Sequence, residues 1–169
     1  MGFWLGWVLL TWLIIKILNR SFWLVAAMGL VLDQATKFLV LRLMSLHQSI
    51  PVWHGVLHLT YVTNSGAAFS MFTNATSSLK WVSLLASLGL ISLGLWSKNL
   101  DRWEKWGFGL ILAGAMGNGI DRFVHGHVID FLELRFIRFP VFNLADVWIN
   151  LGLLCLFILF WQSQGRNRA

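Results

Sequence analysis

Long apolar runs dominate the chain, and four of them are long enough to cross a bilayer or nearly so. They cover residues 22–42, 81–97, 106–120 and 144–161. A transmembrane helix needs about 20 mostly apolar residues, and sustained apolar character over such lengths favours helices over strands. The pattern therefore predicts a mainly α-helical membrane protein, built as a bundle of four transmembrane helices.

A shorter apolar segment precedes these four runs. Residues 2–15 are apolar, and Lys16 and Arg20 follow them. The segment lacks the basic start and the small-residue cleavage site of a secretory signal. We interpret residues 1–20 as a helix that lies in the membrane interface or leads into the first span, or else as an extension without function. Residues 21–169 are interpreted as one membrane domain.

Strict alternation replaces the helical pattern between the first two runs. From Val52 to Val62, β-branched and aromatic residues alternate with their neighbours as is typical of a strand, and Asn64 opens a turn signal, Asn-Ser-Gly. This run also contains His54 and His58. It predicts a small sheet outside the membrane, with its apolar face toward lipid or a helix.

Basic residues give the chain an orientation. They gather at residues 16–20, 98–105 and 166–168, which share one side of the membrane if four spans cross it. Positive charge marks the cytoplasmic side, so the connections 43–80 and 121–143 are predicted to face outward. The second of these connections carries three arginines of its own, which goes against the rule.

The composition supports a membrane protein. Only 12% of the residues are charged, and the chain has 11 Trp and 13 Phe, whereas soluble domains carry about 25% charged residues. We assign the formal net charge of +6 to orientation in the membrane and not to nucleic-acid binding. Cys155 is the single cysteine, which excludes an intramolecular disulfide.

Polar side chains lie at the outer ends of two predicted spans. Asp33 and Lys37 are four residues apart, so they share a helix face with the acid on the favourable N-terminal side. Asn118 and Asp121 are three residues apart, and Arg122 follows directly. We interpret both groups as structural clusters that satisfy their own polar groups inside the bundle. Small residues in the same span, such as Gly at 109 and 117, predict close helix packing.

Two further carboxylates flank the start of the fourth run. Asp130 and Asp146 lie on either side of it, and Asn143 precedes Asp146 by three residues, so that both can project from one helix face. Ionisable groups at membrane depth are costly and mark functional sites, unless an arginine simply neutralises them. When two carboxylates share a site, one keeps a proton, and the pair can deprotonate water while protonating a carbonyl or leaving group. This is the chemistry of aspartic peptidases.

Other chemistries fit the sequence less well. His125, His127 and Asp130 lack the spacing of a helical zinc motif, and neither a nucleophile elbow nor a Walker-type loop is present. We therefore expect no metal and no cofactor. A proton-coupled transporter would also carry aspartates in its spans, but four short spans without an inverted repeat do not favour one. A non-enzymatic membrane assembly factor stays open.

Five short motifs carry a family resemblance that covers residues 22–161. They are LDQATK (32–37), YVTNSGAAFS (61–70), GAMGNGIDR (114–122), GHVIDF (126–131) and FNLAD (142–146). Together they make the chain resemble lipoprotein signal peptidase, also called signal peptidase II, the bacterial membrane aspartic peptidase of prolipoproteins. The apolar segment at 1–20 is a departure from a minimal member of that family.

The resemblance implies a fold, a site and a substrate. The fold is a four-span bundle with a β-cradle on its extracytoplasmic side, in the bacterial cytoplasmic (inner) membrane. The substrate is a prolipoprotein whose cysteine already carries diacylglycerol, cut just before that cysteine by Asp130 and Asp146. Membrane lipids are the other expected partners, nucleic acid is not, and the chain is expected to be monomeric. The supporting polar residues that match the family are Asp33, Lys37, Asn64, Asn118, Asp121, Arg122 and Asn143. Of these, Asn64 is expected to hold substrate backbone, and Arg122 either tunes Asp130 or meets the substrate.

Overall fold

The computed structural model describes residues 19–66, 76–98 and 100–166. The interpretation of residues 1–20 therefore falls almost wholly outside the described residues. The elements in chain order are α2 (Arg20–Leu43), β1 (Ser49–Trp53), β2 (Leu57–Asn64), α3 (Thr76–Trp96), α4 (Arg102–Val124), β3 (Val128–Leu134) and α5 (Leu144–Arg166). Each of the four predicted runs is a helix, which confirms the mainly α-helical class.

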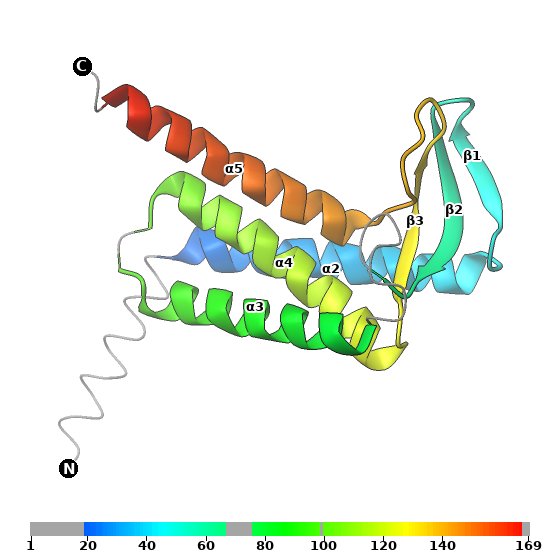
Figure 1. Cartoon of the computed structure of the whole chain (residues 1–169), viewed down its shortest axis with the longest axis horizontal. Coiled ribbons are helices and arrows are strands. Elements are labelled where there is room, and N and C mark those ends of the chain that lie inside the picture. Colours follow the sequence, from blue (N-terminus) through cyan, green and yellow to red (C-terminus); the bar gives the residue numbers. More distant parts are fainter. Residues whose placement is uncertain (1–18, 67–75, 99, 167–169) are drawn as a thin grey trace, which may run out of the picture.

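The four helices lie side by side with the sheet across one end (Figure 1). The start of α2, the connection from α3 to α4 and the end of α5 all lie at the opposite end of the bundle. These are the three places where basic residues gather in the sequence. Of these basic residues, Arg20, Lys98, Arg102 and Lys105 are described, and they lie at this one end, as the charge pattern predicted.

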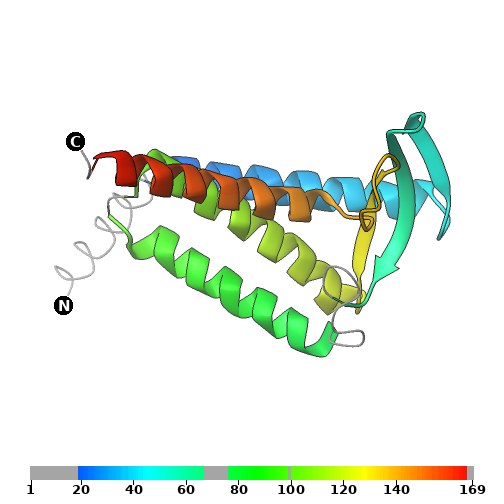
Figure 2. The ribbon, with the colours of Figure 1, turned by 45° about the horizontal axis from the view of Figure 1, so that its top comes forward.

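Helix α4 is the centre of the bundle. It packs against α2, α3 and α5, whereas α3 packs chiefly on α4 and diverges from α2 and α5 toward the sheet (Figure 2). Near its other end, Gly94 of α3 lies against the ring of Phe22 on α2. Among the described helices, α2, Ser78–Trp96 of α3 and Leu144–Gln164 of α5 are apolar enough to cross a membrane, with mean hydropathies of 1.6, 1.6 and 2.0. Glycines and polar residues lower the hydropathy of α4, which contains the third predicted run, 106–120. Its neighbours shield it from lipid, so it does not depend on a uniformly apolar surface.

Glycines bring the backbone of α4 close to its neighbours. A Cβ atom at Gly114 would overlap the carbonyl oxygen of Ala145, and one at Gly109 would lie 2.8 Å from the carbonyl oxygen of Phe22. On α5, a Cβ atom at Gly152 would lie 2.6 Å from the carbonyl oxygen of Gly107. The predicted close packing is confirmed, and it extends along most of α4.

The sheet is antiparallel, in the order β1-β2-β3. The prediction of one alternating strand over 52–62 is wrong in detail, because Gly55 adopts a φ of 75° and turns the chain into a hairpin. His54 consequently lies in the turn and not in a strand. Strand β3 was not predicted, and it is the most buried of the three.

An apolar cluster fixes the sheet to the bundle. Ile129 and Phe131 of β3 pack against Val40 near the end of α2, and all three are buried. A second cluster, formed by Phe22, Ala26 and Leu112, lies between α2 and α4 near the other end. Strand β3 is therefore held firmly beside the outer ends of the helices.

The packing of α4 gives a first testable prediction. We expect Gly114→Ala to destabilise the protein by about 1–3 kcal/mol, because the added Cβ meets backbone that cannot rotate away. The matched control is Gly89→Ala on α3, where a Cβ meets nothing within 4 Å. Alanine there should be neutral or stabilising through helix propensity alone. Thermal unfolding in detergent measures both, and equal midpoints would contradict the close contact.

Candidate active site

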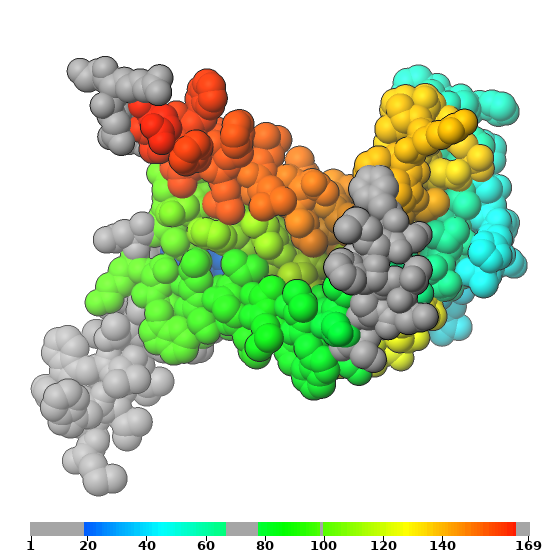
Figure 3. All heavy atoms as spheres, in the orientation of Figure 1, coloured from blue at the N-terminus to red at the C-terminus, as the bar shows by residue number. Residues whose placement is uncertain are grey.

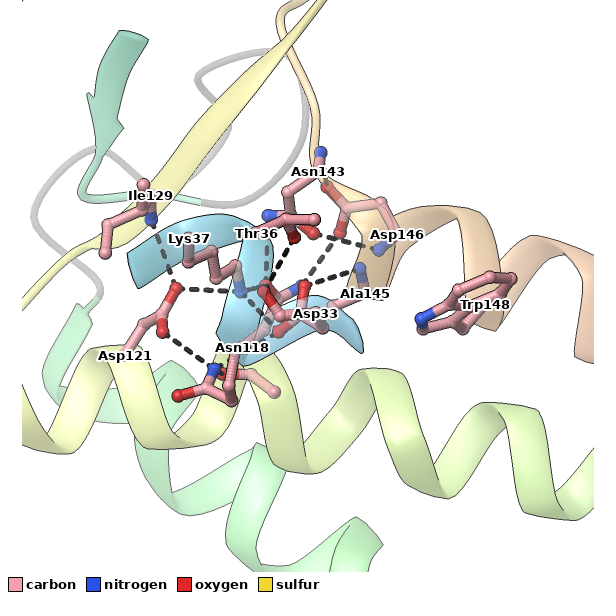
Figure 4. Close-up of polar contacts among 12 residues, drawn as sticks. Asp33, Thr36, Lys37, Asn118, Asp121, Ile129, Asn143, Ala145, Asp146 and Trp148 are labelled. Carbon is pink, nitrogen blue, oxygen red and sulfur yellow. Dashed lines mark hydrogen bonds and ion pairs between the residues drawn. The ribbon is translucent and has the colours of Figure 1, made fainter. Parts of the chain in front are cut away.

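The sequence-predicted polar residues converge where α2, α4, the sheet and the start of α5 meet. Figure 4 shows this for the predicted residues that it labels, Asp33, Lys37, Asn118, Asp121, Asn143 and Asp146. Among the described residues, all nine predicted site residues belong to one hydrogen-bonded network, which extends from Arg122 at one edge to Asn64 at the other. Most of these side chains are buried. The network has two parts, one around Lys37 and one around the two aspartates Asp130 and Asp146.

Asp146 lies in the first turn of α5. Its backbone N–H donates to Oδ1 of Asn143 (3.0 Å), and the backbone N–H of Asn143 donates to Oδ2 of Asp146 (3.3 Å). This reciprocal pair is a capping arrangement, so Asn143 precedes the helix and does not lie on its face as predicted. Nδ2 of Asn118 donates to Oδ1 of Asp146 (2.8 Å). The helix N-terminus and these donors stabilise a negative charge on Asp146.

Asp130 lies on β3 and is 2% exposed. Its Oδ1 accepts from Nδ2 of Asn143 (2.6 Å), and its Oδ2 accepts from Nδ2 of Asn64 (3.0 Å). Burial, followed by the charge of Asp146, raises the pKa of Asp130 to about 6, against the opposing effect of the two amide donors. Asp130 therefore holds a proton more readily than an ordinary aspartate.

Asn64 owes its position to the sheet. It is the last residue of β2, where the predicted Asn-Ser-Gly turn signal begins, and it pairs with Val128 two residues before Asp130 on β3. Its Oδ1 accepts the backbone N–H of Gly66 (3.0 Å), which leaves Nδ2 directed at Asp130. The amide thus contacts a carboxylate, a role that the sequence pattern did not suggest.

Lys37 is the centre of the other part of the network. Its Nζ lies 2.9 Å from Oδ2 of Asp33, 2.8 Å from Oδ2 of Asp121 and 3.1 Å from Oδ1 of Asn118. Asp33 also accepts the backbone N–H of Ala145 at the start of α5 (2.9 Å). The predicted pairing of Asp33 with Lys37 is confirmed, and the polar groups of this cluster bind one another inside the bundle.

Asp121 connects α4 to the strand that carries Asp130. Its Oδ2 accepts the backbone N–H of Ile129, the residue before Asp130 (3.2 Å). Gln34 completes this side of the cluster by donating to Oδ1 of Asp121 (3.2 Å) and to the carbonyl oxygen of Gly117 (3.3 Å). Sequence reasoning missed Gln34, although a glutamine within an apolar span was an available signal.

The arginines do not neutralise the catalytic candidates. Arg122 donates to the carbonyl oxygen of Asn118 (3.3 Å) and to Oγ of Ser83 (3.4 Å). Within the described part of the chain it forms no ion pair, and Arg135 pairs with Glu133 (3.0 Å). The alternative in which Asp130 is simply paired with an arginine is therefore not what the structure contains.

A cavity of about 550 Å³ opens beside the two aspartates. Figure 3 shows the surface hollowed between α5 and the raised part of the sheet. Arg122, Asp130 and Asp146 form part of its polar wall. Apolar side chains from 139–142 and from 147–154 of α5 form most of the remainder. The cavity therefore combines two adjacent carboxylates with a long apolar surface, a lining suited to a chain that is largely apolar.

No histidine or cysteine ligand set accompanies the aspartates. Among the residues that the structure describes, no group of three His, Cys, Asp or Glu side chains is placed to hold a metal ion. His125 and His127 lie beside each other, with ring centroids 6.0 Å apart.

Comparisons with known proteins agree with this geometry. A family model described as signal peptidase (SPase) II matches residues 25–162. The lipoprotein signal peptidase of Microcystis aeruginosa is 52% identical over 149 residues, which cover 88% of this chain and 96% of the relative. That of a Cyanothece species is 53% identical over 155 residues, which cover 89% and 90% of the two chains.

Solved structures agree as well. A structure described as a bacterial membrane enzyme superposes with a TM-score of 0.79 at 26% identity, covering 85% of this chain and 88% of the other. A second such structure superposes with a TM-score of 0.73 at 27% identity, covering 81% and 90%. The extent of these matches shows that the chain belongs to the signal peptidase II family of membrane aspartic peptidases.

Proposed function

We propose that the chain removes the signal peptide from prolipoproteins whose cysteine carries diacylglycerol, cutting just before that cysteine with Asp130 and Asp146 as the catalytic pair. One observation carries the proposal: two carboxylates from separate elements border one cavity, and Asn143 binds both of them. The substrate class is supported by the relatives, which are lipoprotein signal peptidases. Membership of a peptidase family also disfavours the transporter and assembly-factor alternatives.

The two aspartates have different environments, and these divide the chemical roles. Asp130 is buried and its pKa is raised to about 6, so it carries the proton. Asp146 lies at a helix N-terminus with amide donors, so it carries the charge. Asp146 takes a proton from water, the water oxygen attacks the scissile carbonyl, and Asp130 gives its proton to the carbonyl oxygen. When the tetrahedral intermediate collapses, Asp146 gives its proton to the leaving amine, and Asp130 takes a proton from a hydroxyl of the intermediate as the new carboxyl group forms.

The position of the pair suits a substrate held by lipid. Both aspartates lie at the sheet end of the bundle, on β3 and at the start of α5, opposite the end at which Arg20, Lys98, Arg102 and Lys105 lie (Figure 1). With the basic end in the cytoplasm, the pair lies at the outer surface of the bacterial cytoplasmic membrane. A diacylglyceryl cysteine is confined to that depth. Water reaches it there as well, and the apolar wall along α5 accommodates the signal peptide or its lipid.

Because both aspartates take part in the proposed mechanism, an enzyme that lacks either one should lose activity. Asp130→Asn and Asp146→Asn should each reduce turnover by at least ~10³, and the double substitution should cost little more, because residues that act as a unit are not additive. The measurement is the initial rate of cleavage of a diacylglyceryl prolipoprotein in lipid, followed by mass spectrometry.

The matched control for this experiment is Asp101→Asn. Asp101 caps α4 at the basic end of the bundle, and asparagine caps a helix about as well as aspartate. This variant should keep wild-type turnover. A well-folded Asp130→Asn or Asp146→Asn enzyme with near-normal turnover would refute the two-aspartate mechanism.

The pKa of Asp130 predicts the pH dependence. The proton on Asp130 is needed and its pKa lies at about 6, so kcat/KM for the wild type should fall as pH rises through this region. Asn64 lowers the pKa of Asp130 by donating to its carboxylate. Asn64→Leu removes that donor at similar volume and should move the falling limb to higher pH. A limb that stays in place or moves to lower pH would show that Asn64 does not act on this proton.

The same shift predicts how stability depends on pH. Folding raises the pKa of Asp130 from 3.8 to about 6, so the native state binds more protons between these values. The free energy of unfolding should therefore fall as pH rises from about 4 to 6. Asp130→Asn should remove this fall and stabilise the protein above pH 7 by up to about 3 kcal/mol. Thermal unfolding across pH measures it, with Asp101→Asn as control, and an unchanged pH dependence would argue against a buried, protonated Asp130.

A further inference from the structure

Lys37 has no free donor and no acceptor. Its side chain is 2% exposed, and its ammonium contacts two carboxylates, from Asp33 and Asp121, and the amide of Asn118. An ammonium can only donate. The atom of Asn118 that faces Lys37 must therefore be the amide oxygen.

The orientation of the Asn118 amide decides whether Asp146 faces a hydrogen-bond donor or an acceptor. With Oδ1 held by Lys37, Nδ2 is directed at Oδ1 of Asp146 at 2.8 Å. A flipped amide would place an NH₂ group against the ammonium and an oxygen against the carboxylate. Both contacts would be repulsive, so the charge of Lys37 holds the amide in the orientation that gives Asp146 a donor.

A second amide continues the chain of contacts. Nδ2 of Asn143 donates to Oδ1 of Asn118 (3.1 Å) and to Oδ1 of Asp130 (2.6 Å), while its Oδ1 accepts the backbone N–H of Asp146. The oxygen of Asn118 is therefore shared between Lys37 and Asn143. Flipping Asn118 would deprive Asn143 of an acceptor and disturb both aspartates at once.

We propose that Lys37 is a positioning residue for the catalytic pair, because its ammonium fixes the amide of Asn118 and thereby supplies Asp146 with a hydrogen-bond donor. This inference rests on the proposed catalytic function of the two aspartates. The competing explanation is that Lys37 only neutralises Asp33 and Asp121 to hold the helices together. In the first explanation, the hydrogen bond from Lys37 to Asn118 affects the catalytic pair. In the second, only the charge of Lys37 has an effect.

Two variants separate the effect of the charge of the cluster from the effect of the hydrogen bond between Lys37 and Asn118. Asp121→Asn changes the charge of the cluster but keeps the bond from Lys37 to Asn118. Lys37→Met combined with Asp121→Asn restores the wild-type formal charge of the cluster but removes that bond. The other charged groups near the aspartates, Asp33 and Arg122, are untouched in both.

The readout is the pH–rate profile for cleavage of a diacylglyceryl prolipoprotein. In the double variant, Asp146 loses its donor, so the limb that rises with pH should move up by about one pH unit, the size expected for a hydrogen bond to a charged group. In Asp121→Asn it should stay near its wild-type position. The proposal is overturned if the rising limb moves in Asp121→Asn and stays in place in the double variant. It is also overturned if the profile of the double variant falls in amplitude without any movement of this limb.

A separate control tests whether a loss of stability alone would move the limbs of the pH–rate profile. Leu112→Ala removes a buried side chain from the cluster at the other end of the bundle, and the cavity lowers stability without contact to the site. It should change the amplitude of the profile and leave both limbs in place. Should the double variant not fold, Lys37→Gln in the Asp121→Asn background retains one donor group and should give a smaller movement of the same limb. No movement there also overturns the proposal.

A measurement without substrate keeps this inference distinct from the proposed function. The side-chain amide signals of Asn118 and Asn143 in ¹⁵N NMR, assigned through Asn→Ala variants, should both shift in the double variant and stay close to the wild type in Asp121→Asn. Unshifted amides in the double variant mean that Lys37 does not orient Asn118. If the amides shift but the wild type cleaves no prolipoprotein, the proposed function fails while the orientation by Lys37 stands.

Discussion

One buried ammonium group holds together the parts of this molecule that form its site. Lys37 lies on α2, and its two carboxylate partners each accept a backbone N–H from another element, Ala145 at the start of α5 and Ile129 on β3. Without the cation, Asp33 and Asp121 would be buried charges without compensation, which costs several kcal/mol. The cluster therefore sets where α5 begins and where β3 passes.

Four aspartates share this network, and their partners separate them into two kinds. Asp33 and Asp121 contact a cation, which stabilises their charge, as expected of carboxylates that hold the helices together. Asp130 and Asp146 receive donors only from neutral groups, amides and backbone N–H groups. A carboxylate held in this way is oriented without being neutralised by an ion pair. It can therefore exchange a proton, and this is the property that an acid–base pair needs.

The sequence predicted those parts of the fold that depend on local pattern. Hydropathy located the four helices, and four-residue spacing located the pair of Asp33 with Lys37. Contacts between distant segments were not predictable in this way: Asn64 and Asp130 are 66 residues apart and meet because β2 and β3 pair. The single strand predicted through Gly55 failed because alternation continues across a residue that turns the chain. The pairing of Asp130 with Asp146, the proposed catalytic aspartates, was inferred from their positions and from family motifs. The same motifs named Asn64, Asn118 and Asn143 as supporting residues, but only the structure shows which carboxylate each amide contacts.

The polar network also explains why α4 is the least apolar of the four helices. Asn118 and Asp121 must lie on a helix that the others surround, because lipid offers their side chains no partners. Space for the network depends on the absence of a side chain at Gly117, where a Cβ atom would overlap the carboxylate of Asp33. The glycines of α4 thus serve the site as well as the packing. Glycines on α4 leave space for buried carboxylates, but they also make the helix less apolar. Its stability in the membrane therefore depends on contact with its three neighbours.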